Sequence, residues 1–204
     1  MSIMVIKTYE KQIIKLAEKM GTLRAQDLSR FDIPRVILTR LVQSGRLERV
    51  ARGLYRLPEM IVSEKEALIT IALKVPKAVF CLLTALHFYE LTTQISRKIW
   101  IAMPQGSHTP IIKYPPIKMV QYSGCAYSEG IQVVTVDRVE LRLYSPAKTV
   151  VDCFKHRNKI GLDVALEALK ESLKQKKATR DEIYFYAKMM HVKKMIRPYI
   201  EAME

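Results

Sequence analysis

A helical pattern that leads directly into a short hairpin pattern is the feature that most constrains the first quarter of the chain. Apolar residues recur at helical spacing over residues 34–43, and Ser44-Gly45 ends the pattern. Two runs of strand-forming residues, 47–50 and 54–57, follow on either side of a turn that contains Gly53. Glycine supplies the positive φ that a tight hairpin turn needs. The order therefore predicts a helix followed by a β-hairpin.

Two more helical patterns come before this pair. A helix is expected over residues 8–20, with an apolar stripe on one side and lysines on the other, and a shorter helix over residues 24–30. Asp32 is a suitable N-cap for the helix at 34–43, which has proline at its start. Helix, short helix, turn, helix and hairpin is the order of a winged helix-turn-helix. We predict this fold for residues 1–58.

Positive charge is concentrated in the same stretch. The whole chain has 34 Lys and Arg against 20 Asp and Glu, a net charge of +14. Residues 1–57 hold 12 basic and 5 acidic side chains, a net charge of +7, and the remaining 147 residues hold 22 and 15, also +7. Charge per residue is more than twice as dense in the first part. Such an excess favours a polyanionic partner, which is a nucleic acid, an acidic protein or a membrane surface.

The helix at 34–43 and the hairpin after it supply the candidate DNA-binding residues. A helix that buries one face leaves a polar face for the major groove, where Arg recognises guanine and Gln recognises adenine. Hairpin arginines would contact phosphates or the minor groove. The alternative is a three-helix packing module with a solvated basic face. The candidates are Arg35, Thr39, Arg40, Gln43, Arg46, Arg49, Arg52 and Arg56.

Residues 63–204 predict a second, α+β domain with a small antiparallel sheet and a helical C-terminal half. Ser63 and Glu66 have the spacing of a capping box for a helix through Ala72, and residues 77–91 predict a largely buried helix. Strands are expected over residues 98–103, 117–122, 131–136 and 139–143, and helices over 146–157, 162–174, 179–190 and 193–202.

No motif in the chain supports catalysis or metal binding. The four histidines are scattered, and neither a phosphate-binding loop nor a nucleophile elbow is present. Glu129 upstream of residues 140–142 (Glu-Leu-Arg) offers a nuclease-like arrangement, which the polar face of an alternating strand explains as well. We therefore expect no enzyme activity, no catalytic residue, no metal and no cofactor.

The cysteines and the apolar runs bear on the compartment. Cys81, Cys125 and Cys153 are far apart and odd in number, which fits reduced thiols in the core or partly buried. No apolar run approaches the length that a membrane span or a signal peptide requires. We expect a cytoplasmic protein with no membrane partner.

Three stretches resemble the AbiEi antitoxin family of abortive-infection toxin–antitoxin systems. They are residues 49–55 (RVARGLY), residues 84–91 (TALHFYEL) followed by 98–102 (KIWIA), and residues 143–152 (LYSPAKTVVD). The resemblance implies an N-terminal domain that represses its own promoter on double-stranded DNA. It also implies a C-terminal domain that counteracts a cognate nucleotidyltransferase-like toxin. Lysine stands at position 148, where the family commonly has arginine.

The third stretch also has a structural explanation. Ser145 is a good N-cap, Pro146 suits the first turn of a helix, and Asp152 can pair with Lys148 at i, i+4. We expect a monomer or a weak dimer. The alternative function is a winged-helix transcription factor whose C-terminal domain binds a small ligand or dimerises. The candidate antitoxin face, taken as exposed, consists of Lys148, Lys155, Arg157 and Lys159.

Overall fold

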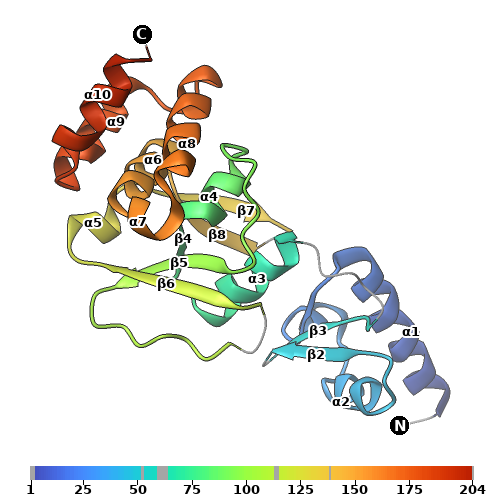
Figure 1. The fold of residues 1–204 in the computed structure, drawn as a ribbon. Coiled ribbons are helices and arrows are strands. Elements are labelled where there is room, and N and C mark those ends of the chain that lie inside the picture. The colour runs from blue at the N-terminus through green and yellow to red at the C-terminus, as the bar shows by residue number, and fades with distance from the viewer. Residues whose placement is uncertain (1–2, 52, 59–63, 113–114, 138, 204) are drawn as a thin grey trace. The chain divides into compact units, whose positions relative to one another are not determined.

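The computed structural model describes residues 3–51, 53–58, 64–112, 115–137 and 139–203. The chain divides into two compact units, Met1–Thr70 and Ile71–Glu204, and the boundary lies within helix α3 (Glu64–Lys74; Figure 1). Ser63, the expected cap of this helix, lies outside the described residues. No helix in the described part of the chain is long and apolar enough to cross a membrane.

The first unit is a small helical cluster with a three-stranded antiparallel sheet in the order β1-β3-β2. Its core joins Ile13 and Ala17 of the first helix to Ile37 and Leu41 of the last helix, and Leu47 leads into the hairpin. The elements are α1 (Ile3–Met20), β1 (Leu23–Arg24), the 3-10 helix η1 (Asp27–Phe31), α2 (Val36–Gln43), β2 (Glu48–Ala51) and β3 (Leu54–Arg56).

The stretch between α1 and α2 differs from the expected short helix over 24–30. Leu23 pairs with Tyr55 of β3, so this segment begins as a strand and only then forms η1. Asp32 does not cap α2. It ends η1 in a left-handed conformation, with φ of 50°, and Arg35 occupies the N-cap position of α2. The pairing with β3 determines the conformation of this segment. Because the two strands are about thirty residues apart in the chain, the local sequence pattern could not predict the pairing.

The second unit has a five-stranded sheet in the order β6-β5-β4-β8-β7, with helices packed on it (Figure 1). Its strands are β4 (Val79–Phe80), β5 (Ile99–Pro104), β6 (Ile117–Tyr122), β7 (Ile131–Val136) and β8 (Val139–Tyr144). Its further helices are α4 (Leu82–Phe88), α5 (Cys125–Ser128), α6 (Pro146–Lys155), α7 (Arg157–Ile160), α8 (Leu162–Lys174), α9 (Arg180–Met189) and α10 (Lys193–Glu201).

This sheet corrects two expectations. The residues predicted as one helix over 77–91 form strand β4 and the shorter helix α4, because Phe80 pairs with both Ile101 and Leu143 at the centre of the sheet. The sheet is mixed rather than antiparallel. β4 with β5 and β7 with β8 are antiparallel, whereas β5 with β6 and β4 with β8 run parallel.

Several local expectations are confirmed. β7 and α8 have the predicted bounds, Ser145 accepts a hydrogen bond from the Lys148 N–H at the start of α6, and Thr179 forms a capping box with Glu182. The expectation for the cysteines holds at two positions. Cys81 and Cys153 are buried free thiols, and Cys125 is an exposed one.

Helix α6 carries a charged pair into the core of the second unit. Both carboxylate oxygens of Asp152 accept hydrogen bonds from Lys148 Nζ at 2.7 Å, and both side chains are 0% exposed. The predicted i, i+4 pair is therefore present. The expectation that Lys148 is an exposed surface cation is wrong, because α6 packs between α4, α8 and α9 and is buried from Pro146 to Phe154.

Aromatic rings complete the environment of this ammonium group. Lys148 Nζ lies 4.2 Å from the ring centre of Tyr144 and 4.7 Å from that of Tyr122. A cation over an aromatic face is stabilised by the ring quadrupole, and more so away from water. Gly130, with φ of +75°, leaves room for the lysine stem, since a Cβ there would lie 3.0 Å from Lys148 Cβ. Burial raises the pKa of Asp152, while the neighbouring Lys148 acts to lower it.

Replacing Lys148 with methionine is expected to destabilise the fold strongly. The change removes the partner of a buried carboxylate, and breaking such a pair costs about 3–5 kcal/mol. Urea denaturation followed by circular dichroism measures the free energy of unfolding. The matched control is Lys155→Met on the same helix, where an exposed lysine should cost no more than about 0.5 kcal/mol.

The double variant Lys148→Met/Asp152→Leu tests the cause. Apolar replacement of both partners removes the uncompensated charge, so most of the lost stability should return. A single variant as stable as Lys155→Met would show that the pair does not lie in the core.

His156 stands at the end of α6 with its Nε2 atom buried and without a hydrogen-bond partner among the described residues. Burial, followed by the nearby charges of Lys159 and Lys155, lowers the pKa of His156 from 6.5 to about 4. The folded state therefore holds the neutral imidazole. The unfolded chain binds the proton more readily between these two values.

Stability should consequently depend on pH through this residue. The contribution of His156 is fully present above pH 6.5 and is lost as the pH falls toward about 4, because protons then favour the unfolded state. The measurement is the free energy of unfolding from pH 7 to pH 4 for the parent and for His156→Gln. Carboxylates common to both proteins cancel in the difference. Parallel pH profiles would contradict the assignment.

Candidate nucleic-acid interface

Helix α2 separates an apolar face from a polar one. Ile37, Leu38 and Leu41 are buried in the core of the first unit, with exposures of 0%, 1% and 1%. The predicted interface residues of this helix are all exposed: Arg35, Thr39, Arg40 and Gln43. Arg35, Thr39 and Gln43 recur at intervals of four, so they form one strip along the helix with Arg40 beside it. The structure thus brings these four predicted residues together.

Two exposed apolar side chains at the ends of neighbouring elements were missed by the sequence analysis. Val36, the first residue of α2, is 54% exposed, and Phe31, the last residue of η1, is 51% exposed. Val36 precedes the buried positions of α2 and does not share their face. A large apolar side chain at the start of the helix, off its buried stripe, was the signal that could have identified it.

The hairpin is anchored at its turn. Gly53 has φ of 77°, as its sequence position predicted, and its carbonyl accepts a hydrogen bond of 2.8 Å from the Ala25 N–H. Arg49 is exposed on β2 and stands opposite Tyr55 of β3. Arg52, a predicted interface residue, lies outside the described residues. The turn is therefore fixed to the segment between α1 and α2.

Two of the predicted arginines are engaged within the unit. Arg46 is 48% exposed and its guanidinium donates to Glu10 of α1 at 2.8 Å, which ties the hairpin entrance to the first helix. Arg56 is only 14% exposed. It donates twice to Glu48 Oε2, at 2.9 and 2.7 Å, and lies 3.8 Å from Glu66. Its position differs from the expected outward one because two carboxylates hold it.

The candidate antitoxin face keeps three of its four residues at the surface of the second unit. Lys155 and Lys159 are exposed, and Arg157 is half-buried, with its guanidinium donating to the Phe154 carbonyl at 3.2 Å. Lys148 lies in the core, as described above. The face is therefore carried by α7 and the end of α6.

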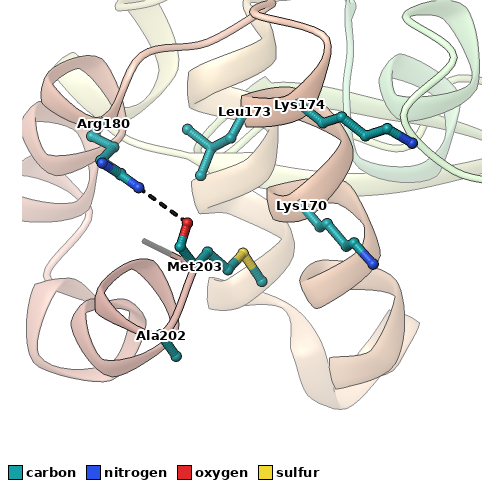
Figure 2. Close-up of a pocket in the computed structure, with 6 residues that line it drawn as sticks. All are labelled: Lys170, Leu173, Lys174, Arg180, Ala202 and Met203. Atoms are coloured by element: carbon teal, nitrogen blue, oxygen red, sulfur yellow. Dashed lines mark hydrogen bonds between the residues drawn. The ribbon is translucent and has the colours of Figure 1, made fainter.

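The second unit also has a hollow of about 700 Å³ between α8, α9 and the end of α10. Figure 2 shows Arg180 donating to the Met203 carbonyl at 3.1 Å, with Leu173 also lining the hollow. Lys170 and Lys174 extend away from Arg180 (Figure 2). Because the three cations do not converge, the hollow is not arranged to hold a small anion.

The described residues show no group of three or more His, Cys, Asp or Glu side chains that could hold a metal ion. Glu129 ends the short helix α5, and Glu140 is an exposed residue of β8 opposite Thr135. Arg142 donates to the Pro76 carbonyl at 3.3 Å. The nuclease-like spacing in the sequence is thus distributed over a helix end and a strand, each with a structural explanation.

Comparison with solved structures identifies a similar fold. The chain matches the structure titled "Crystal structure of RV2827C protein from Mycobacterium tuberculosis" with a TM-score of 0.62 and 10% sequence identity, over 89% of this chain and 71% of that one. At this identity the similarity concerns the fold alone. Among curated proteins, none matches the chain.

A family comparison identifies the first unit. Residues 11–58, which contain α2 and the hairpin, match the family described as "Transcriptional regulator, AbiEi antitoxin". The match confirms the resemblance that the sequence analysis found. The family is a regulatory one, and its matched region includes all eight predicted interface residues. Residues 11–58 are therefore similar to the AbiEi antitoxin family of transcriptional regulators.

Proposed function

We propose that residues 1–58 form a winged helix-turn-helix that binds double-stranded DNA and represses the promoter of the chain's own gene. The observation that carries this proposal is the division of α2 into a buried apolar face and an exposed strip of Arg35, Thr39, Arg40 and Gln43. A helix of this kind presents its polar face to the major groove.

The chemistry of the strip suits the edges of base pairs. An arginine donates two hydrogen bonds to guanine O6 and N7, and glutamine pairs in the same bidentate manner with adenine. Val36, exposed at the start of α2, has the size and polarity to contact the methyl group of thymine. Arg35 and Arg40 are thus the candidates for guanine recognition, and Gln43 for adenine.

Phosphate contacts would come from the hairpin and the residues around it. Arg49 is exposed on β2, and Arg52 belongs to the turn in sequence. Arg46 could exchange Glu10 for a phosphate, since an exposed ion pair contributes only about 0–1 kcal/mol. Arg56 has a different part in this proposal: its pairs with Glu48 and Glu66 brace the hairpin.

The second unit is proposed to counteract a cognate nucleotidyltransferase-like toxin. The family description of residues 11–58 as an AbiEi antitoxin supports this assignment. The proposed contact face consists of the exposed Lys155 and Lys159, which lie four residues apart on consecutive helices, and the half-buried Arg157. Lys148 has no part in it, because the core encloses that side chain. Catalysis is not part of the proposal.

Substituting Arg40 with alanine is expected to weaken binding to the region upstream of the gene by about 1–3 kcal/mol and to relax sequence preference. The physical reason is the loss of a bidentate contact to one base. Fluorescence anisotropy with upstream and random duplexes, across a salt series, gives both affinities. Binding to both duplexes should weaken steeply with salt because neutralised phosphates release counterions.

Arg97→Ala is the matched control, since it removes an exposed arginine from the second unit and should leave both affinities unchanged. Equal affinity of the parent for upstream and random DNA at every salt concentration would refute sequence-specific repression.

The full-length variant Lys155→Glu/Lys159→Glu is expected to lose protection against the toxin encoded beside the gene and to keep its affinity for DNA. Two reversed charges on the proposed face should repel the partner or the polyanion for which it competes. Growth during co-expression measures protection. Lys170→Glu/Lys174→Glu is the control, since it reverses two exposed lysines with the same spacing on α8. Full protection by the first variant would remove this face from the proposal.

A further inference from the structure

Strand β7 leaves one side of its main chain without a partner. It is the last strand of the sheet order β6-β5-β4-β8-β7, so among the described residues only β8 pairs with it. Its six residues, Ile-Gln-Val-Val-Thr-Val, include no charged side chain and four β-branched aliphatic ones. Val133 at its middle is 58% exposed.

The register shows which main-chain groups point outward. The Ser145 N–H donates to the Gly130 carbonyl, so residues 130 and 145 form a hydrogen-bonded pair. Val136 pairs with Val139 across a loop of two residues, which also makes position 136 a hydrogen-bonded one. Hydrogen-bonded and non-bonded pairs alternate along an antiparallel ladder. The even positions of β7 therefore bond to β8, and the main chains of Ile131, Val133 and Thr135 face away from it.

No other described group bonds to the main chain of these three residues. Proteins usually protect such an edge with charged side chains, proline or a bulge. The opposite edge, β6, follows this rule. It carries the exposed Lys118, and its Gln121 side chain donates to the Ser107 carbonyl in the loop that follows β5. β7 has the composition of a strand that pairs on both sides.

We propose that β7 pairs antiparallel with β7 of a second copy of this chain, about a two-fold axis at Val133. This register faces Val133 with its own counterpart and Ile131 with Thr135 of the partner subunit, so all three outward residues exchange both of their main-chain hydrogen bonds. β-branched pairs of this kind stabilise a sheet, and no charged side chain lies within residues 131–136 of either copy. The result is a sheet continuous through both copies.

A second copy fits this edge better than a different protein does. Every side chain of the strand is neutral, so two identical strands oppose each other without repulsion, even though each chain has a net charge of +14. The repulsion between the net charges of the two copies is screened, because the Debye length is about 8 Å in about 0.15 M salt. Dimerisation would also give the assembly two DNA-binding units, as sites of two-fold symmetry require. The inference does not depend on the proposed function.

Sedimentation velocity over a concentration series, in about 0.15 M salt and without DNA, tests the dimer. The parent is expected to dimerise, and Val133→Lys and Val133→Pro should each raise the dissociation constant by at least about tenfold. Lysine introduces like charges at the axis, and proline removes the N–H of Val133 in each copy. Phe185→Lys is the matched control, since Phe185 is 59% exposed on α9, away from β7 in the sequence. This variant should dimerise like the parent.

A cross-link tests the register directly. The Cα atoms of a hydrogen-bonded antiparallel pair lie about 5.5 Å apart, within the range of a disulfide. In a Cys125→Ser background, which removes the exposed thiol, Val133→Cys should give a disulfide-linked dimer on mild oxidation. Gln132→Cys should not, because residue 132 would face residue 134 of the other copy.

A parent that is monomeric at all concentrations overturns the proposal. A dimer that persists equally in Val133→Lys and Val133→Pro also overturns it, because the interface then lies elsewhere. A monomeric parent in which Val133→Lys abolishes toxin protection would assign the edge to another protein and would likewise refute pairing between copies.

Discussion

The second unit depends on the burial of helix α6, which packs between the helices α4, α8 and α9. Every residue from Pro146 to Phe154 is buried, so the polar side chains of this stretch must find their partners inside the core. Lys148 and Asp152 neutralise each other inside the core, and two tyrosine rings receive the ammonium group. Glycine at position 130 suits this arrangement, since its φ is +75° and a Cβ there would lie in tight contact, 3.0 Å from Lys148 Cβ. The pair thus dictates the residues around it.

The two units differ in how their arginines and lysines are used. In the first unit, Arg46 and Arg56 form ion pairs with Glu10 and Glu48 that fix the hairpin. The strip on α2 has no described ion pair. An Arg of that strip keeps its donors available for a base edge, whereas Arg56 does not. In the second unit, the most buried cation is structural. Charge alone would have ranked Lys148 with Lys155, although their exposures are opposite.

Local signals in the sequence predicted the helices with strong caps and the hairpin strands. The Ser145 cap, the Thr179 capping box and the positive φ at Gly53 each depend on residues close in the chain. The failures involve distant partners. β4 was expected to be helical because its apolar residues fit either period, and only its two sheet neighbours decide between them. The interior position of Lys148 likewise depends on α8 and α9, which follow α6 in the chain and pack against it. The pattern of residues along α6 alone does not predict this packing.

Strand β7 is a second case in which the local sequence predicts an element but not its neighbours. Its bounds were predicted correctly, but its place at the end of the sheet follows only from the strand order. An uncharged edge strand exposes a monomer to unspecific pairing with other chains, and the same edge allows two identical copies to pair. If two copies share this edge and the first unit binds DNA as proposed, each first unit brings its partner to the DNA at a high effective concentration, so modest contacts from each strip would suffice for tight binding. Pairing through β7 in the second unit would then raise the affinity of the proposed DNA contacts made by α2 in the first unit.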